Sequence, residues 1–334
     1  MVRNYKIAVL PGDGIGPEVM GACLKVLDAV QEKFKFELEL HYGDAGENCV
    51  LRHKTNLPKH TIELLEETDA CLKAPMTNLP GHEDVAEKIR KRFDLNATVY
   101  AGQSFAGASV VRKADFLIVR ERTEGLNNIE KKSGQKATAS RIVTAKATES
   151  LALLAVELAL ERQKKVTIVN ARDTLKLSDT LFRDVVFKAT KKFKKLEVDE
   201  CFVDEAASLL INGPESFDVL LTENMVGRML AGECAGIFGR GMLPVAHMGK
   251  KYNLFETYHG SAQKYTNMNR VNPLGMILAG KVMLQELGEH EAAKAIGIAV
   301  KNVLAEGRFK TYDLEGSGST NQVADAVATR ILKH

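Results

Sequence analysis

Features that would assign this chain to a specialised class are missing from its sequence. The five cysteines are scattered, with no CxxC pair, which argues against a structural zinc site and suits a reducing compartment. No apolar run approaches the ~20 residues of a membrane span, so we expect no membrane association. The net charge of +3 is small for 334 residues and argues against a nucleic-acid partner.

Linkers, repeats and a leader segment are also missing. There is no internal repeat, low-complexity tract or Pro/Ser-rich linker, so a two-domain arrangement would need chain crossings without a long tether. The first residues, "MVRNYK", lead directly into a predicted strand, so we expect no signal or transit peptide. We therefore expect a cytoplasmic protein, with the mitochondrial matrix as the alternative if the chain is a processed form.

What the sequence does contain is a regular alternation of two kinds of segment. The strand-like runs are "YKIAVL", "FELELHYG", "DACLKA", "DFLIVRE", "KKVTIVNA" and "FDVLLTE". The helix-like segments have apolar residues at helical spacing and include "GPEVMGACLKVLDAVQEKF", "KHTIELLEE", "ATESLALLAVELALERQ", "LSDTLFRDVVFKATKKF" and "NPLGMILAGKVMLQELG". This alternation predicts an α/β architecture.

A glycine-rich turn follows the first predicted strand, in "VLPGDGIGPEVM". Pro17 falls in the first turn of the helix that follows, where proline is tolerated. The glycines do not have the GxGxxG spacing of a dinucleotide fingerprint, and no acidic residue ends a second strand about 20 residues further on. The segment is therefore either a tight βα turn or a ligand-binding loop.

Charged residues follow the apolar strand in "FLIVRERTEGLNN". Arg120 and Arg122 lie at its C-terminal end, which is where open α/β sheets bind ligands. A surface salt-bridge cluster explains the pattern equally well. Arg90, in "AEKIRKRFDL", is a further candidate contact for an anion, although such a residue on an exposed helix is usually only solubilising.

The segment "LFETYHGSAQKYTNMNRVNP" predicts a strand, a polar loop and the start of a helix. Backbone amides in a loop of this kind can hold a phosphate group. His259, at the end of the strand, is either part of such a site or a structural histidine.

Together these motifs resemble the β-decarboxylating dehydrogenase family of isocitrate, 3-isopropylmalate and homoisocitrate dehydrogenases. The likeness covers nearly the whole chain in order and includes "PGDGIGPE", "DACLKAPMT", "RKRFDL", "VRERTEG", "VDEAASLL", "FDVLLTEN", "FETYHGSA", "VNP" and "TYDLEG". It implies a two-domain α/β fold with a shared mixed sheet, which is not a Rossmann fold, and a dimer. We assign 1–98 plus 252–334 to a large nucleotide-binding domain, and 99–251 to a small domain carrying the dimer interface.

The resemblance also implies a chemistry. Family members bind a polycarboxylate hydroxy acid with Mg²⁺ or Mn²⁺, transfer hydride to NAD(P)⁺ and decarboxylate the product. The positions that match substrate or anion contacts are Arg90, Arg120, Arg122, Arg228, Tyr100, Asp84 and Thr77. The positions that match cofactor contacts are His259, Gly260, Ser261, Ala262, Lys264, Tyr265, Asn272 and Tyr312. Because Lys264, Tyr265 and Tyr312 are similar to NADP-type members, we expect NADP, with NAD as the alternative.

The family's catalytic positions carry other residues in this chain. The lysine position is Ala171, the tyrosine position is Asn127, and the three metal-carboxylate positions are Asp204, Arg228 and Gly232. A guanidinium cannot ligate Mg²⁺, and the charge of Arg228 opposes a dication in the same space. We therefore expect the Mg²⁺ or Mn²⁺ site to be lost. A one-residue slip of the alignment would bring Arg172 toward the lysine position.

These replacements favour a noncatalytic regulatory or scaffolding subunit that binds a polycarboxylate, a nucleotide or both. Noncatalytic subunits of heteromeric NAD-isocitrate dehydrogenases are similar in this respect, so the partner is either a second copy or a catalytic family member. The alternative is an active NAD(P)-dependent oxidoreductase acting on a hydroxy acid by altered, metal-independent chemistry. A second alternative is a conventional isocitrate or isopropylmalate dehydrogenase.

Overall fold

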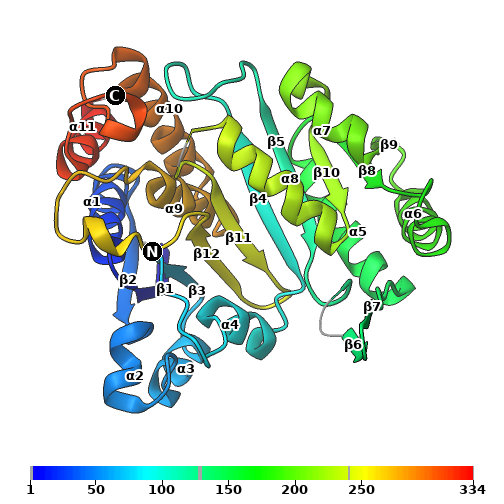
Figure 1. Cartoon of the computed structure of the whole chain (residues 1–334). Helices are drawn as coiled ribbons and strands as arrows, with labels where there is room; N and C mark the ends of the chain where they lie inside the picture. Colours follow the sequence, from blue (N-terminus) through cyan, green and yellow to red (C-terminus); the bar gives the residue numbers. More distant parts are fainter. Residues whose placement is uncertain (1–2, 127–129, 240, 334) are drawn as a thin grey trace. The chain divides into compact units, whose positions relative to one another are not determined.

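The computed structural model describes residues 3–126, 130–239 and 241–333, and its chain divides into two compact units. Unit 1 comprises Met1–Leu95, Phe105–Val110 and Phe238–His334, and unit 2 comprises Asn96–Ser104 and Val111–Ile237. Strands and helices alternate along both units, as Figure 1 shows. The predicted α/β class is confirmed.

Unit 1 is built on a mixed sheet with the strand order β2-β1-β3-β12-β11. The strands are β1 (Arg3–Leu10), β2 (Phe36–Tyr42), β3 (Ala70–Lys73), β11 (Pro244–Met248) and β12 (Asn253–Thr257). Neighbouring strands are parallel except for β11, which pairs antiparallel with β12. The last segment of unit 1 starts at Phe238, before the predicted boundary at residue 252, because β11 pairs with β12.

The helices of unit 1 cover this sheet and frame its loops. They are α1 (Gly16–Phe34), α2 (Glu47–His53), α3 (Lys59–Glu66), α4 (Val85–Phe93), α9 (Leu274–Glu286), α10 (His290–Glu306) and α11 (Thr320–Lys333), with the short 3₁₀ helices η2 (Gln263–Tyr265) and η3 (Tyr312–Leu314). Helix α9 buries residues on all sides, from Leu274 to Leu284, and contacts α1, α10, β11 and β12. An apolar surface all round is typical of a central core helix.

Within unit 2 the strand order is β4-β5-β10-β8-β9. Its strands are β4 (Ala97–Gln103), β5 (Asp115–Glu121), β8 (Lys165–Asn170), β9 (Glu197–Phe202) and β10 (Val219–Thr222), and β6 (Glu130–Ser133) and β7 (Lys136–Ala139) form a separate hairpin. Strand β4 runs antiparallel to β5, and the other neighbours are parallel. Every residue of β10 is buried, which suits a central strand of a parallel sheet.

The helices of unit 2 are α5 (Ala145–Leu160), α6 (Lys176–Thr190), α7 (Val203–Asn212) and α8 (Asn224–Ile237), with η1 (Pro214–Ser216). Helix α8 directly follows β10, and Glu223 caps its start by accepting the backbone N–H groups of Met225 and Val226 at 3.0 and 2.8 Å. No helix in the described part of the chain is long and apolar enough to cross a bilayer.

Candidate functional site

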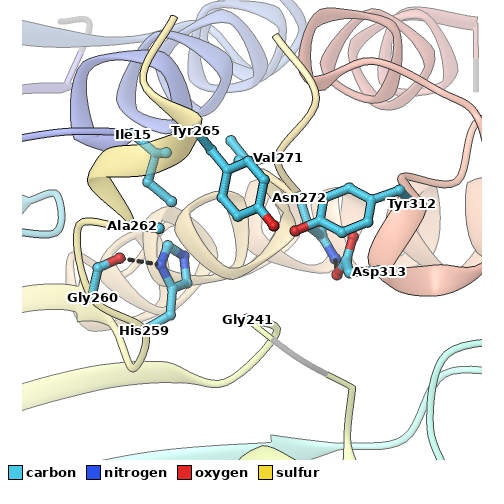
Figure 2. Close-up of a pocket in the computed structure, with 10 residues that line it drawn as sticks. All are labelled: Ile15, Gly241, His259, Gly260, Ala262, Tyr265, Val271, Asn272, Tyr312 and Asp313. Carbon is cyan, nitrogen blue, oxygen red and sulfur yellow. Dashed lines mark hydrogen bonds between the residues drawn. The ribbon is translucent and has the colours of Figure 1, made fainter. Parts of the chain in front are cut away.

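Unit 1 contains a pocket of about 460 Å³ beside the end of β12. It is lined by Ile15, Gly241, His259, Gly260, Ala262, Tyr265, Val271, Asn272, Tyr312 and Asp313, which Figure 2 shows as sticks. The lining comes from the turn after β1, the segment before β11, the loop between β12 and α9, and η3. Six of the predicted cofactor residues therefore lie together around one cavity.

The glycine-rich turn after β1 is a structural anchor for this pocket. The Ile15 N–H donates to the carbonyl oxygen of Ser261 at 2.9 Å, and a Cβ on Gly14 would stand 2.1 Å from the same oxygen. The buried Asp13 carboxylate accepts the backbone N–H groups of Glu47 and Thr77, both at 2.9 Å. Of the two interpretations of this turn, the tight βα turn accounts for these contacts, and its contribution to the pocket is the Ile15 side chain.

His259 has one ring nitrogen engaged and one without a partner. Its Nδ1 lies 3.1 Å from the Gly260 carbonyl oxygen, and its buried Nε2 has no hydrogen-bond partner among the described residues. Burial lowers the pKa of His259, so the ring is neutral at pH 7. A neutral imidazole with an unpartnered nitrogen in a pocket fits a flat ligand that can share a hydrogen bond, such as a purine ring.

Two tyrosines line the pocket, and each has a cation beside its ring. The rings of Tyr265 and Tyr312 lie 5.7 Å apart, and their hydroxyl groups face each other in Figure 2. The Lys264 ammonium lies 4.8 Å from the Tyr265 ring centre, and the Arg270 guanidinium lies 4.6 Å from that of Tyr312. A hydrogen bond from Tyr312 and the charge of Lys264 lower the pKa of Tyr265. Arg270 was not among the sequence candidates, and its basic type beside "VNP" was the only available signal.

Asn272 and Thr77 stabilise the loops around the pocket. The Asn272 side chain donates to Asp313 at 3.0 Å and accepts the backbone N–H of Leu274 at 3.0 Å, so it ties η3 to the start of α9. The Thr77 hydroxyl lies 3.0 Å from that of Ser261 and accepts a hydrogen bond from Gln263 at 2.8 Å. Thr77 was predicted as an anion contact, and the partners of its hydroxyl group, Ser261 and Gln263, belong to the loop between β12 and α9.

The predicted anion residues of unit 2 are centred on Arg120 at the end of β5. Its guanidinium donates to the Tyr100 hydroxyl at 2.9 Å, to the Asn224 carbonyl oxygen at 2.7 Å and to the Asn224 side-chain oxygen at 2.8 Å. Arg120 is only 6% exposed. It therefore fixes the start of α8 to the sheet while its charge stays close to the strand end.

Arg122 and Arg228 complete a group that we call the arginine cluster, Arg120, Arg122 and Arg228. Burial, together with the charges of Arg120 and Arg228, lowers the pKa of Arg122 to about 10, against the opposing effects of Tyr100 and Glu121. The Arg122 guanidinium is still charged at pH 7, because a pKa of about 10 lies well above neutrality. Repulsion among like charges favours a bound anion, which relieves it.

Gly227 allows α8 to pack directly against Arg120. A Cβ at this position would stand 2.2 Å from the Thr222 hydroxyl and 2.7 Å from Arg120 Cγ. Gly236 on the same helix has nothing within 4 Å of an added Cβ.

We expect Gly227→Ala to lower the free energy of unfolding by about 1–3 kcal/mol, because the added methyl group overpacks a buried contact. The matched variant Gly236→Ala should raise it by up to about 1 kcal/mol, because alanine is the better helix former. Urea denaturation of both variants measures the difference. Equal changes at the two positions would show that α8 does not pack on Arg120 in this way.

The described residues do not fit a family-type divalent metal site. Arg228 and Gly232 are exposed on α8, and Asp204 is exposed near the start of α7. Asp204 belongs to no group of three His, Cys, Asp or Glu side chains with converging ligand atoms in the described chain. We derive no chemical step through a metal ion at these positions.

The position that matches the family's catalytic lysine is occupied by Ala171. Ala171 follows β8, and its backbone N–H donates to Asp179 at 2.6 Å. The neighbouring Arg172, which a shifted alignment would bring toward this position, donates to Glu200 at 2.9 Å. Its guanidinium is thus held by the carboxylate of Glu200. The tyrosine position, Asn127, lies outside the described residues.

The remaining candidates lie in unit 1, on or just before α4. The Asp84 side chain accepts the backbone N–H of Glu87 at 3.0 Å and caps the helix, which gives it a structural function. Arg90 is buried and forms an ion pair with Glu87. It stays a prediction that Arg90 and Asp84 contact the same ligand as the arginine cluster.

Comparisons with known proteins now give the class of this chain. Residues 6–327 match the family described as isocitrate/isopropylmalate dehydrogenase, and the chain belongs to that family. It is 36% identical over 99% of both chains to a 3-isopropylmalate dehydrogenase from Methanothermobacter thermautotrophicus. It is also 36% identical, over 98% of this chain and 99% of the relative, to a 3-isopropylmalate/3-methylmalate dehydrogenase from Methanocaldococcus jannaschii.

Solved structures agree with this assignment. Isocitrate dehydrogenase from Methylococcus capsulatus aligns with a TM-score of 0.87 and 33% identity, covering 98% of this chain and 99% of the other. The apo form of a β-decarboxylating dehydrogenase from Thermococcus kodakarensis aligns with a TM-score of 0.88 and 28% identity, covering 98% and 96%. The resemblance inferred from the motifs is confirmed at the level of family and fold.

Proposed function

We propose that this family member binds NADP in the unit 1 pocket and a polycarboxylate at the arginine cluster, without metal-dependent decarboxylation. The observation that carries the proposal is the cation Arg228 at a position that matches a metal carboxylate of the family, on α8, the helix that packs on Arg120 at Gly227. Two positively charged guanidiniums close together attract a carboxylate and repel Mg²⁺. The protein would then act as a regulatory or scaffolding subunit whose binding sites are kept while catalysis is lost.

The nucleotide part of the proposal is supported by the composition of the pocket. Ile15 and Val271 supply apolar contacts, and His259 presents an unpartnered nitrogen. Lys264 and Arg270 stand beside the two tyrosines, where they would contact a 2′-phosphate through charge-assisted hydrogen bonds. When bound, NADP would supply hydride chemistry, and this chain's own residues would hold and orient it.

A second candidate is an active dehydrogenase, and the relatives favour it. The two archaeal proteins that are 36% identical to this chain are named as dehydrogenases of 3-isopropylmalate or 3-methylmalate. An active protein would either use altered, metal-independent chemistry or be a conventional enzyme in which other residues serve the roles of lysine, tyrosine and metal. The described residues at Ala171, Arg228 and Gly232 argue against the conventional form.

A partner subunit is part of the first proposal. Met225 and Met229 are 47% and 61% exposed on α8, on the same helix as the exposed Gly232. Exposed methionines beside small residues suit close helix packing between chains. We propose a homodimer, or a heteromer with a catalytic family member, that uses this surface.

Titration calorimetry with NADP⁺ and NAD⁺ tests the nucleotide site. We expect Lys264→Ala and Arg270→Ala each to weaken NADP⁺ binding about 10-fold or more, because each removes a charged hydrogen-bond donor. NAD⁺ affinity should change less than about threefold, because NAD⁺ lacks the 2′-phosphate. Arg308, which lies over the ring of Phe309, provides a matched control as Arg308→Ala and should leave both affinities unchanged.

Two results would overturn parts of this proposal. If either pocket variant weakens NAD⁺ and NADP⁺ equally, the cations do not recognise a 2′-phosphate. If the same purified protein oxidises 3-isopropylmalate, 3-methylmalate or isocitrate with Mg²⁺ at about 1 s⁻¹ or faster, the range of ordinary enzymes, the second candidate is correct.

A further inference from the structure

We propose that Asp44, His53 and His60 form a binding site for a divalent transition-metal ion of the zinc class. This site lies in unit 1 and uses none of the positions that match the family's metal carboxylates. Asp44 is in the loop after β2, His53 is the last residue of α2, and His60 is in the first turn of α3. In Figure 1 these two helices are labelled in the blue part of the chain.

The three side chains already converge without an ion. One ligand atom from each residue lies within 4.8 Å of the other two. The His60 Nε2 lies 3.8 Å from the Asp44 carboxylate oxygen, and the two imidazole rings are 5.3 Å apart at 66°. Ligand atoms around tetrahedral zinc are about 3.3 Å apart, given zinc–nitrogen bonds of about 2.0–2.1 Å. Small rotations of these exposed side chains would close the remaining distance.

The backbone under the three residues is held by hydrogen bonds. The Thr61 hydroxyl donates to the Asp44 carbonyl oxygen at 2.7 Å, which joins the loop to α3. The Gly46 N–H donates to the Asn56 carbonyl oxygen at 2.9 Å, which joins the two ends of the α2 segment. Asn56 is itself buried. The convergence of the three side chains therefore rests on a fixed backbone.

The donor set selects the metal. Two imidazole nitrogens and one carboxylate oxygen suit Zn²⁺ or Co²⁺, whereas Mg²⁺ prefers oxygen ligands and near-octahedral geometry. Three protein ligands leave a coordination position for water. Helix α2 has Cys49 as its buried residue, so it is held by little apolar contact. A shared metal ion would fix the end of α2 to α3 and to the loop after β2.

Titration of the EDTA-treated full-length protein with ZnCl₂ tests this site, with Co²⁺ absorption spectra to report nitrogen ligation. We expect one Zn²⁺ per chain and a concentration-dependent rise in the unfolding temperature. His53→Gln and His60→Gln should each weaken binding about 10–100-fold or more, since loss of even an outer-shell partner costs that much. His290→Gln, at another exposed histidine of unit 1, should leave binding unchanged.

Two results would contradict the zinc site. If Zn²⁺ does not bind, or if both histidine variants bind it as well as the unchanged protein, the site does not exist. The three ligand side chains are exposed, so the variants should unfold in EDTA at the same temperature as the unchanged protein. Titrations with nucleotides, or with a polycarboxylate such as citrate, test the proposed function and do not depend on this outcome.

Discussion

Glu256→Gln is expected to lower the free energy of unfolding by about 3–5 kcal/mol, as the breaking of a buried charge pair does. The Glu256 carboxylate on β12 lies 2.5 Å from the Lys73 ammonium of β3 and 2.7 Å from His247 Nε2 of β11. Lys73 and His247 are each only 4% exposed. A neutral glutamine would leave the Lys73 ammonium buried in the sheet without a countercharge.

This pair also sets the pH range of stability. Burial would raise the pKa of Glu256, but Lys73 and His247 outweigh burial and hold it below its ordinary 4.5. Its stabilising contribution is therefore fully present above about pH 4.5 and is lost as the pH falls toward the folded-state value. Burial would lower the pKa of Lys73, but Glu256 raises it above 10.5, so that contribution is present below about pH 10.5 and is lost as the pH rises further.

Urea denaturation of both proteins between pH 3 and pH 8 measures the cost of Glu256→Gln and the loss of stability in acid, with a surface pair as the control. Glu63 pairs with Lys59 on α3 at 3.1 Å, and both side chains are more than half exposed. Glu63→Gln should cost no more than about 0.5 kcal/mol, because water screens such a pair. A loss below about 1 kcal/mol for Glu256→Gln would mean that Lys73 finds other partners. The variant should also show a flatter loss of stability in acid, because the titrating carboxyl group is gone.

Arg228→Asp is expected to weaken citrate binding about 100-fold, measured in EDTA so that no divalent metal takes part. The substitution removes an attractive charge from the arginine cluster and places a repulsive one there, at an effective dielectric constant far below that of water. Loss of a hydrogen bond to a charged group is worth about 1.5–3 kcal/mol, which is roughly 10–150-fold in affinity. Arg228→Gln removes the charge without reversing it, so its citrate affinity should lie between that of the unchanged protein and that of Arg228→Asp.

Arg112→Asp provides the matched control, because Arg112 is another exposed arginine of unit 2. It should leave citrate affinity within about threefold of the unchanged protein. We expect no Mg²⁺-dependent turnover in Arg228→Asp, because Ala171 still stands at the position that matches the family's catalytic lysine. Turnover in this single variant would show that our assignment of the lysine and tyrosine positions is wrong. Citrate binding that requires Mg²⁺ in the unchanged protein would contradict the metal-free site.

The order of motifs and the pattern of apolar residues were enough to predict the family and the α/β class. The second half of β1 and most of β10 are continuous apolar runs, and α1 and α5 have helical spacing, so the information is local. The strands β4, β6, β7, β9 and β11 were not predicted. Strand β9 is polar and has no fully buried residue, and β11 begins with Pro244, so neither gives a local signal.

For the site, the sequence by itself determined the residue types at the matched positions, including the cation Arg228 and the alanine Ala171. Only the tertiary structure decided which side chains contact each other. It assigned Arg172 to Glu200, brought Arg270 to the Tyr312 ring and joined Asp44 to His53 and His60. The physical reason is that apolar periodicity depends on near neighbours in the chain, whereas a charged side chain finds its partner through the packing of segments far apart in sequence.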